Sequence, residues 1–566
     1  INKILGIVSY NQVRLDLLEK PVSKSKLEKD IKRIMGDSFS SVVMKENKIS
    51  ITQVDEEINQ IHKMAMLFSI VFILLSILSI YTTMSRLISN QMVQIGTLKS
   101  LGFYDRQIYF HYGAYGFLVA IIGSLVGVIF GYTVVANLVM NIKKATLTLP
   151  IWKKSFGIDS MILIVLIVTV CTLAAIITTR KVVKNNPSFT IKGMLDKKSS
   201  GPGIYKKSRL SYDWLWTLRS IRIHPIRTFM SITAIVGSIV LMVAGLGVWD
   251  SLYSSYQDVY NNEFCYKYIG QVYGESYNNL SRKFNSFDVQ FAQSETADFS
   301  FHGIEKSGSL LVLDSGDKIR IFDAKSKKKI RIEKDEVAIA SQLAEQLDVK
   351  VGDKIAYKTK SSLNEHRVTV TAIVDAKIPQ GIFIYKDKVK NFEPNTIYIG
   401  DSEAYEQAKK EESISNIISI KKQQDNMKEM MDSVHSIMYI LIVAAFVLSV
   451  VILYDLGILS YLERYREYAT MKVIGFKHSE IMGMVFKESV LNLLTGFVIG
   501  IPLSKQFLKL YIRVVSMDSM EWTPIIAKDH FLIVIFCVIG FSVLVNLVVS
   551  MRIRKIDMVE ALKSIE

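Results

Sequence analysis

The chain has 566 residues, 50% of them hydrophobic, with 69 Lys and Arg against 53 Asp and Glu and a formal net charge of +16. Its apolar residues lie in long uncharged blocks, which excludes an intrinsically disordered chain, and its 3 cysteines are too few for a disulfide-stapled secreted domain. The spacing typical of a metal site is not found among the cysteines, Cys171, Cys265 and Cys537, or among the scattered histidines. The basic excess raises nucleic acid as a partner, and its placement along the chain decides that question.

Seven apolar runs are long enough to cross a bilayer as helices, because a hydrocarbon core of about 30 Å needs about 20 helical residues. They are Met64–Ser85, Tyr112–Ile142, Ser160–Thr179, Thr228–Trp249, Ile437–Tyr454, Ser489–Ser504 and Phe531–Met551. The sixth run is short, but Lys505 and Lys509 can extend from its end to the membrane surface. One such run alone could be a buried core helix, whereas seven together indicate an integral membrane protein.

The positions of Lys and Arg predict the orientation of these spans, since basic loops stay on the cytoplasmic side. Nearly all of the basic excess lies in four segments, which are 84–111, 180–227, 459–488 and 552–566. We therefore expect these segments and the C-terminus in the cytoplasm and residues 250–436 outside. The nearest partners of the basic segments are then anionic lipid head groups, and no nucleic-acid partner is expected.

Residues 1–63 precede the first span and are also expected outside. No signal peptide precedes them, and the first residue is Ile1 rather than Met. We expect an upstream transmembrane helix and most of a first extracytoplasmic domain, of which residues 1–63 would be the tail. Eight spans would then be present in the full length.

Residues 194–227 connect the third and fourth spans with a polar linker and an amphipathic helix. Trp214–Ile223 is predicted to be helical, with Trp214, Leu215, Leu218 and Ile221 on one side and Arg219 and Arg222 on the other. A helix of this kind lies along a membrane surface or packs on a partner, and the pattern leaves both open. Pro225 begins the fourth span, 228–249, and Trp249, Tyr253, Tyr256 and Tyr260 are expected as interfacial anchors at its exit.

Residues 250–436 have alternating apolar patterns in place of long apolar runs and predict a mixed α/β domain. The expected strands are Leu310–Leu313, Ile319–Phe322, Val337–Ile339, Lys354–Tyr357, Val368–Val374 and Thr396–Ile399. The expected helices are Ser341–Leu347, with Ser341 as its N-cap, and Glu403–Glu411. Val351–Lys354 is typical of a tight turn.

The chain contains a parallel internal repeat. Thr97–Phe103 matches Thr470–Phe476 at an offset of 373, and the pair Gly123 and Gly127 falls on Gly496 and Gly500. After the third helix of each unit, Lys181–Lys184 aligns with Arg552–Lys555 at an offset of 371. Residues 64–193 and 437–566 are therefore two three-helix units of the same topology. The GxxxG pairs indicate plain helix packing.

Gly102 and Gly475 lie where a helix C-cap needs a left-handed residue, so each is expected to end a cytoplasmic helix and turn the chain. Such a turn explains one glycine. The same heptapeptide at two places favours a docking surface for a cytoplasmic partner, although an ordinary structural turn stays open.

Several catalytic signatures are absent from the sequence. The chain has no GxxxxGK[ST], HExxH or GxSxG motif, so it cannot bind ATP through a P-loop of its own. Asp455, at the end of the fifth span, is the clearest ionisable residue in a span and is expected to be hydrated or paired with a helix. The repeats are parallel rather than inverted, which disfavours an ion-coupled carrier. We therefore expect a non-catalytic protein without a cofactor that draws its energy from elsewhere.

The repeated units resemble the FtsX-like permeases of ABC transporters, of the MacB and lipoprotein-exporter type. Their hallmark R-x-x-E-x-x-x-x-K-x-x-G is similar to Arg464, Glu467, Lys472 and Gly475 of the second unit, whereas the first unit has Gln91 and Gln94 before Lys99 and Gly102. Residues 336–344 and 351–355 look like part of a MacB-type extracytoplasmic domain.

This resemblance implies a permease subunit in a bacterial plasma membrane that couples a separate cytoplasmic ATPase, in two copies, to external domains. Those domains would export or extract a hydrophobic compound, a peptide or a lipid-linked substrate, or act on an extracytoplasmic accessory protein. The residues implied to couple the ATPase are Gln94, Lys99, Gly102, Phe103, Arg464, Glu467, Lys472, Gly475 and Phe476.

Two other functions stay open. The first is a non-transporting mechanotransmitter of the same architecture that regulates a cell-wall hydrolase or a sensor kinase. The second is a stand-alone membrane receptor that uses residues 250–436, but it leaves the duplicated heptapeptide unexplained.

Overall fold

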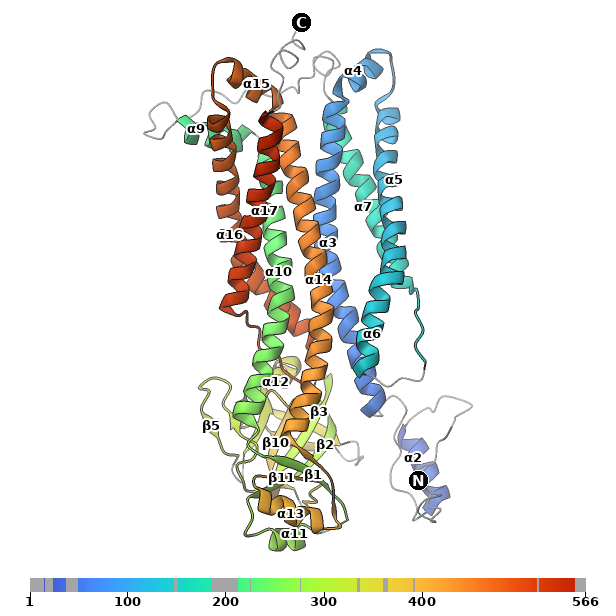
Figure 1. Cartoon of the computed structure of the whole chain (residues 1–566). Helices are drawn as coiled ribbons and strands as arrows, with labels where there is room; N and C mark the ends of the chain where they lie inside the picture. The colour runs from blue at the N-terminus through green and yellow to red at the C-terminus, as the bar shows by residue number, and fades with distance from the viewer. Residues whose placement is uncertain are drawn as a thin grey trace. The chain divides into compact units, whose positions relative to one another are not determined.

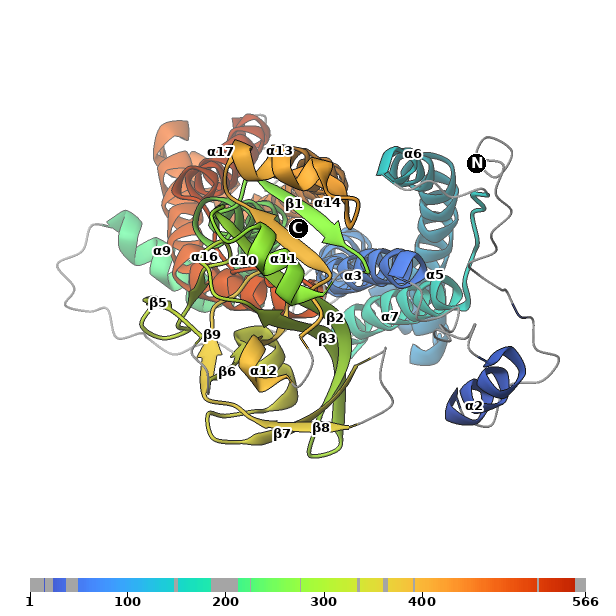
Figure 2. The same cartoon turned by 90° about the horizontal axis from the view of Figure 1, so that it is seen from below.

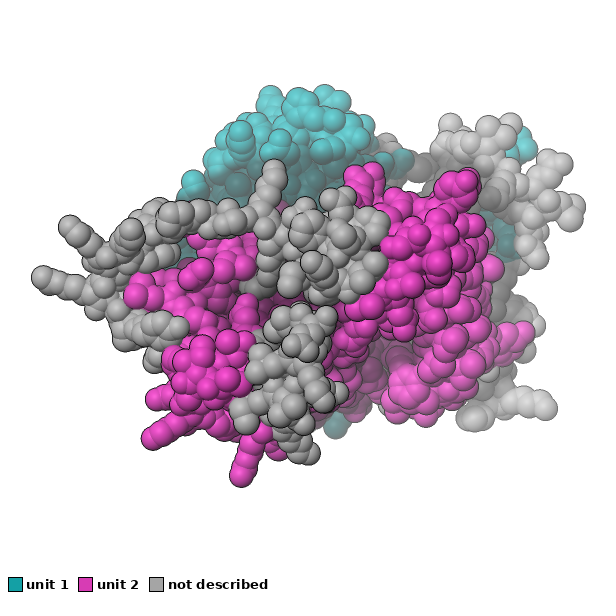
Figure 3. All heavy atoms as spheres, turned by 90° about the horizontal axis from the view of Figure 1, so that it is seen from above, with its two compact units in different colours: residues 1–58, 269–417 teal, residues 59–268, 418–566 magenta. Residues whose placement is uncertain are grey.

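The computed structural model describes residues 15, 24–36, 49–146, 151–184, 212–223, 225–274, 276–332, 336–359, 365–389, 392–516 and 519–554. They form two compact units, which are residues 1–58 with 269–417 and residues 59–268 with 418–566 (Figure 3). The first contains a β-sheet and is called the sheet unit, and the second is the helical unit. The predicted linker at 197–203 and the C-terminal segment after Arg554 lie outside the described residues.

The helical unit contains the seven predicted spans, each within a helix long and apolar enough to cross a membrane. These helices are α3 (Ile49–Asn90), α5 (Asp105–Phe130) continued by η3 (Gly131–Val135) and α6 (Ala136–Thr146), α7 (Ile158–Val183), α10 (Pro225–Asp258) continued by η4 (Val259–Glu263), α14 (Ile420–Glu463), α16 (His478–Val515) and α17 (Lys528–Arg554). Most run well beyond the predicted limits, and the sixth, predicted as short, has 38 residues. Hydropathy marks only the apolar part of a helix, whereas the backbone hydrogen bonds continue into polar sequence.

Three short helices stand at the ends of these spans. They are α4 (Met92–Ser100), α15 (Tyr465–Val473) and α9 (Tyr212–Ile223). A further helix, α2 (Lys24–Met35), lies in the N-terminal segment. The order α3-α4-α5-α7 therefore repeats as α14-α15-α16-α17, which is the duplication expected from the sequence (Figure 1).

The helix α10 is the most enclosed span, because it packs against α14, α16 and α17 (Figures 1 and 2). In its most apolar 18-residue stretch 67% of residues are buried, compared with 6% in α5 to α6. The two three-helix units meet through α3, where Asp455 of α14 accepts hydrogen bonds from Ser79 and Thr83, both at 3.3 Å, and pairs with Arg86 at 3.7 Å. Asp455 is thus paired with a neighbouring helix.

The sheet unit is built on a ten-stranded mixed sheet in the order β12-β1-β11-β2-β3-β10-β6-β9, with β7 paired to β2 and β8 to β7. Its strands are β1 (Tyr268–Val272), β2 (Val289–Phe301), β3 (Ile304–Leu313), β6 (Val337–Ala340), β7 (Lys354–Thr359), β8 (His366–Thr369), β9 (Ala372–Val374), β10 (Gly381–Tyr385), β11 (Thr396–Ile399) and β12 (Ile414–Ser419), and a separate pair is β4 (Ile321–Phe322) with β5 (Lys329–Ile330). The helices are α11 (Tyr277–Lys283), α12 (Ser341–Leu347) and α13 (Ser402–Lys410), with a 3-10 turn at η5 (Lys386–Lys388). The core lies between α12 and β3, β6, β7 and β10.

The expected α/β class is confirmed, but several predicted elements differ. Val368–Val374 is two strands, because Val370 donates its N–H to Asp353 on one side and Thr371 donates to Val337 on the other. The helix α12 begins at Ser341 with Ala340 at the N-cap position, so the predicted Ser341 cap is wrong. The turn at 351–354 is present, with Gly352 at φ +100°.

Candidate partner-binding site

The turns after α4 and α15 share one hydrogen-bond pattern. Gly102 and Gly475 have φ values of +91° and +104°, in the left-handed region that favours glycine. Phe103 donates its N–H to the carbonyl of Leu98 at 3.1 Å, and Phe476 donates to Met471 at 3.0 Å. This is a Schellman C-cap, so the predicted helix ends at both glycines are confirmed.

Lys99 and Lys472 make equivalent contacts with the third helix of their own unit. Lys99 Nζ donates to the carbonyl of Val183 at 2.5 Å, and Lys472 Nζ donates to that of Arg554 at 3.2 Å. Val183 and Arg554 are equivalent in the repeat. Each lysine therefore satisfies a free carbonyl at the end of α7 or α17 and fixes the short helix to its unit.

Large apolar side chains are exposed at both turns. Leu101 is 72% exposed and its repeat equivalent Ile474 is 70% exposed, with Phe103 at 48%. Gln94 and Glu467, on the preceding helices, are exposed as well, while Phe476 is half-buried. Since α4 and α15 lie at the same end of the helical unit, these residues form two similar apolar tips (Figure 1). Leu101, Phe103 and Ile474 are hereafter the tip residues.

Arg464, by contrast, is 1% exposed. Its guanidinium binds Glu488 of α16 at two points, with Nη1 to Oε2 at 2.6 Å and Nη2 to Oε1 at 3.1 Å. Glu488 also pairs with Arg227 of α10 at 2.9 Å and accepts a hydrogen bond from Ser220 of α9 at 3.1 Å. The charged residue that opens the hallmark motif therefore faces its own protein and joins α9, α10 and α16 to the start of α15. We call Arg227, Arg464 and Glu488 the buried charge cluster.

The aromatic residue Trp216 of α9 covers this cluster, with the Arg464 guanidinium 4.9 Å from its ring centre. Among the described side chains of α9, Thr217 and Ser220 are buried, whereas the apolar residues Trp214, Leu215, Leu218 and Ile221 are half-buried. The reason is that α9 packs on the charged end of α16, where hydroxyl groups satisfy carboxylates better than leucine does. Although burial disfavours the charged form, Tyr468 and Glu488 hold the pKa of Arg464 above its ordinary value.

The first unit has a neutral arrangement at the same place. Gln91, the equivalent of Arg464, accepts a hydrogen bond from the hydroxyl of Tyr112 at 2.8 Å, and the equivalent of Glu488 is Tyr115. The buried charge cluster thus belongs to the second unit alone. The sequence analysis did not identify Glu488 and Arg227, each of which directly precedes an apolar run. Two residues of opposite charge at the starts of two apolar runs were the signal that could have indicated an ion pair.

Groups of three or more His, Cys, Asp or Glu residues that could hold a metal ion do not occur in the described part of the chain. Duplicated membrane helices with capped short helices between them define a multi-pass membrane protein built from two like units. The family model for the FtsX-like permease C-terminal domain matches residues 66–187 and again 439–558. Both units therefore belong to the FtsX-like permease family, which supports a permease-type ABC transporter subunit or a related FtsX function. Members of this family are non-catalytic membrane subunits that partner with cytoplasmic ABC ATPases. A comparison with curated proteins gave no significant match.

Proposed function

We propose that the protein couples ATP hydrolysis by a separate cytoplasmic ATPase to movement of an extracytoplasmic sheet unit, and so exports or extracts a hydrophobic compound, a peptide or a lipid-linked substrate. Two ATPase subunits would bind one chain, one on each tip, with the tips on the cytoplasmic side of a bacterial plasma membrane. The observation that carries this proposal is the repeated exposure of Leu101 and Ile474 on identically capped turns. Leu101 and Phe103 lie on the same turn, and a contiguous exposed apolar patch commonly marks a surface that a partner covers.

The second unit offers a route from the ATPase to the membrane helices. A displacement of α15 would act on α16, α10 and α9 through the buried charge cluster, whose members are held by ionic hydrogen bonds. At the other end of α10, the residues that follow η4 are hydrogen-bonded to the start of α14. Ile420 donates its N–H to the carbonyl of Lys267 at 2.8 Å, and the hydroxyl of Tyr266 donates to the side-chain carbonyl of Gln423 at 2.9 Å. These two helices lead directly into β1 and out of β12, the strands that would receive the motion.

The experiment is co-purification of the chain, in mild detergent, with a candidate P-loop ATPase that is co-expressed with it. Leu101→Asp with Ile474→Asp should reduce recovery of the ATPase at least tenfold, because a charge replaces an apolar contact on each tip. His302→Ala, at the β2–β3 hairpin of the sheet unit, is the matched control and should leave recovery unchanged. Equal recovery with both variants would refute the proposed docking surface.

The same coupling would serve a mechanotransmitter that regulates a cell-wall hydrolase or a sensor kinase. The close burial of α10, which suits a rod that transmits force, is the observation that favours this second candidate. ATPase activity of the reconstituted complex distinguishes the two: stimulation by a small amphiphilic substrate indicates transport, and stimulation only by a protein partner indicates regulation.

A further inference from the structure

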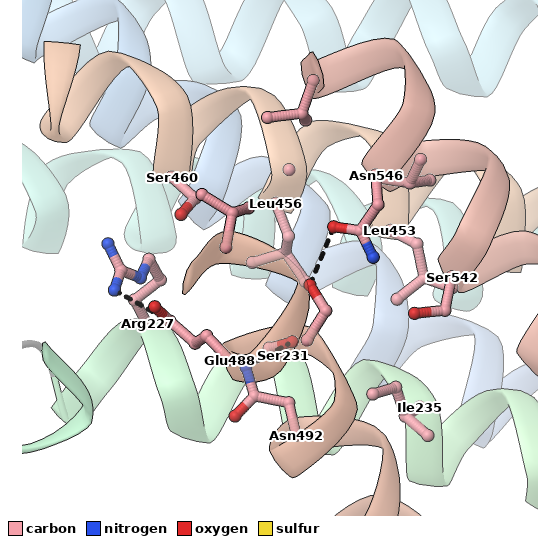
Figure 4. Close-up of a pocket in the computed structure, with 15 residues that line it drawn as sticks. Arg227, Ser231, Ile235, Leu453, Leu456, Ser460, Glu488, Asn492, Ser542 and Asn546 are labelled. Atoms are coloured by element: carbon pink, nitrogen blue, oxygen red, sulfur yellow. Dashed lines mark hydrogen bonds and ion pairs between the residues drawn. The ribbon is translucent and has the colours of Figure 1, made fainter. Parts of the chain in front are cut away.

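A pocket lies between α10 and the three long helices of the second unit, α14, α16 and α17 (Figure 4). Its volume is about 70 Å³. The lining residues are Arg227, Ser231, Ile235, Leu453, Leu456, Gly457, Ser460, Val485, Glu488, Ser489, Asn492, Ser542, Val545, Asn546 and Val549. More than half of these side chains are polar, which is unusual among membrane-spanning helices because an unsatisfied polar group in hydrocarbon costs several kcal/mol.

The two asparagines are only partly satisfied by the protein. Asn546 Oδ1 accepts a hydrogen bond from Ser489 at 2.8 Å, and Asn492 Nδ2 donates to Ser231 at a long 3.5 Å (Figure 4). Among the described residues, Asn546 Nδ2 and Asn492 Oδ1 have no hydrogen-bond partner. The pocket therefore offers one free donor and one free acceptor from buried amides.

The first unit shows that the three-helix fold does not need this pocket. By the repeat, Asn492, Ser489 and Asn546 correspond to Val119, Gly116 and Ala175. In the first unit α5 and α7 pack directly against each other at this place, since a Cβ placed on Gly116 would lie only 2.5 Å from the Cβ of Ala175. The second unit has instead a hydrogen-bonded Ser489–Asn546 pair and a polar space beside it.

The charge of the pocket limits what it can hold. Arg227 at one end is paired with Glu488 at 2.9 Å and with Glu463 at 3.5 Å, so its charge is compensated and no cation is left for a phosphate. Ile235, Leu453 and Val545 provide an apolar wall beside the amides and hydroxyls. This combination suits a neutral group with hydroxyls attached to a hydrocarbon chain.

We propose that this pocket binds the neutral, hydroxyl-bearing head group of a membrane lipid, of about the size of glycerol. A volume of about 70 Å³ holds about five water-sized groups, which matches a glycerol moiety of six non-hydrogen atoms. Asn546 Nδ2 donates to one hydroxyl oxygen and Asn492 Oδ1 accepts from another. The site does not depend on ATPase binding at the tips.

The test uses the full chain purified in detergent and a monoacylglycerol that carries a photoreactive group on its acyl chain, close to the glycerol. Wild-type protein should be labelled saturably at one site, on peptides from α16 and α17. Asn492→Val with Asn546→Ala installs the residues that the first unit has, and should weaken labelling at least tenfold. Val498→Ala, on an exposed face of α16, is the control and should label as wild type does.

Three results would overturn the proposal. One is unchanged labelling of the Asn492→Val, Asn546→Ala protein while its thermal unfolding shows that it is folded. Another is equal competition by the methyl ester of the same fatty acid, which lacks the hydroxyls and would show that the head group is not recognised. The third is absence of saturable labelling in the wild type, the outcome expected for a pocket that holds only water.

Discussion

Arg464 and Glu488 form a two-point ion pair, at 2.6 and 3.1 Å, in which the side chains are 1% and 8% exposed. Burying both charges costs desolvation energy, so a pair of this kind contributes little net stability compared with apolar residues of the same shape. Its value lies in specificity, because Glu488 also holds Arg227 and thereby fixes which surfaces of α10 and α16 meet the start of α15.

Glu488→Gln should destabilise the protein strongly, because it removes the carboxylate that Arg464 binds and leaves the buried Arg227 with Glu463 alone, at 3.5 Å. Loss of one partner of a buried pair costs about 3–5 kcal/mol. Adding Arg464→Gln, the residue of the first unit, should recover part of that loss. Thermal unfolding of the purified chain measures both effects.

The control for this experiment is Glu467→Gln, which removes an exposed carboxylate from the same short helix and should change stability by less than about 0.5 kcal/mol. If Glu488→Gln and Glu467→Gln had equal effects, the buried charge cluster would not hold α15 in place.

Gly102→Ala and Gly475→Ala should each destabilise their turn, because φ near +91° and +104° is strained for any residue with a Cβ. An added Cβ would meet no described atom within 4 Å at either position, so the cost is conformational and about 1–2 kcal/mol. Asparagine tolerates the left-handed region better and should restore part of the loss. Hydrogen exchange of residues 92–108 and 465–481 detects the loosened helix ends.

Gly483→Ala serves as the comparison, since Gly483 lies inside α16 and an added Cβ would have no atom of the described residues within 4 Å. There alanine should be neutral or stabilising by up to about 1 kcal/mol, because glycine is a poor helix former. Destabilisation at all three glycines alike would argue against the left-handed C-caps.

The sheet unit should lose stability in acid through Asp375. Burial by itself would raise the pKa of this carboxyl, but hydrogen bonds and charges from Lys327 and Lys377 lower it below its ordinary value. The unfolded chain then binds the proton more tightly, so the stabilisation is present above about pH 4 and is lost as the pH falls through the lower folded pKa. Hydrogen exchange at β9 and β10 between pH 5 and 3 should show this loss.

Asp375→Asn should remove most of this acid sensitivity at β9 and β10 and lower stability near neutral pH. An unchanged pH profile in the variant would assign the acid sensitivity to other carboxylates of the sheet unit, among them Asp317, whose pKa is also lowered by Lys329 and Arg320.

The spans, the duplication and the glycine caps could be predicted because each depends on local sequence. A span depends on the length of an apolar run, the duplication is visible in a repeated heptapeptide, and each cap needs one residue with φ above zero. The strands β2 and β10 were missed for different reasons. β2 carries polar residues on both faces in its middle, and β10 is a short apolar run without alternation. The burial of Arg464 could not be predicted, since its partners come from α16 and α10 and only tertiary packing brings them together.

The paired GxxxG motifs give a prediction in which each unit controls for the other. Gly496 and Gly500 lie against α10, and a Cβ added to them would be 2.5 Å from Ile235 and 2.8 Å from Ile239. Gly123 and Gly127 meet no described atom within 4 Å. Gly496→Leu or Gly500→Leu should therefore separate α16 from α10 and cost about 1–3 kcal/mol or more, as overpacking does.

The equivalent substitutions Gly123→Leu and Gly127→Leu should be neutral or stabilising in the purified chain, because α5 has room for the side chain and leucine favours the helix over glycine. Unfolding temperatures in one detergent, with cysteine cross-linking between α10 and α16 as a second readout, compare the four variants directly. A loss of stability in the first unit as large as in the second would mean that Gly123 and Gly127 pack against a helix as Gly496 and Gly500 do. Loss in the second unit alone would show that its glycines are kept for contact with α10.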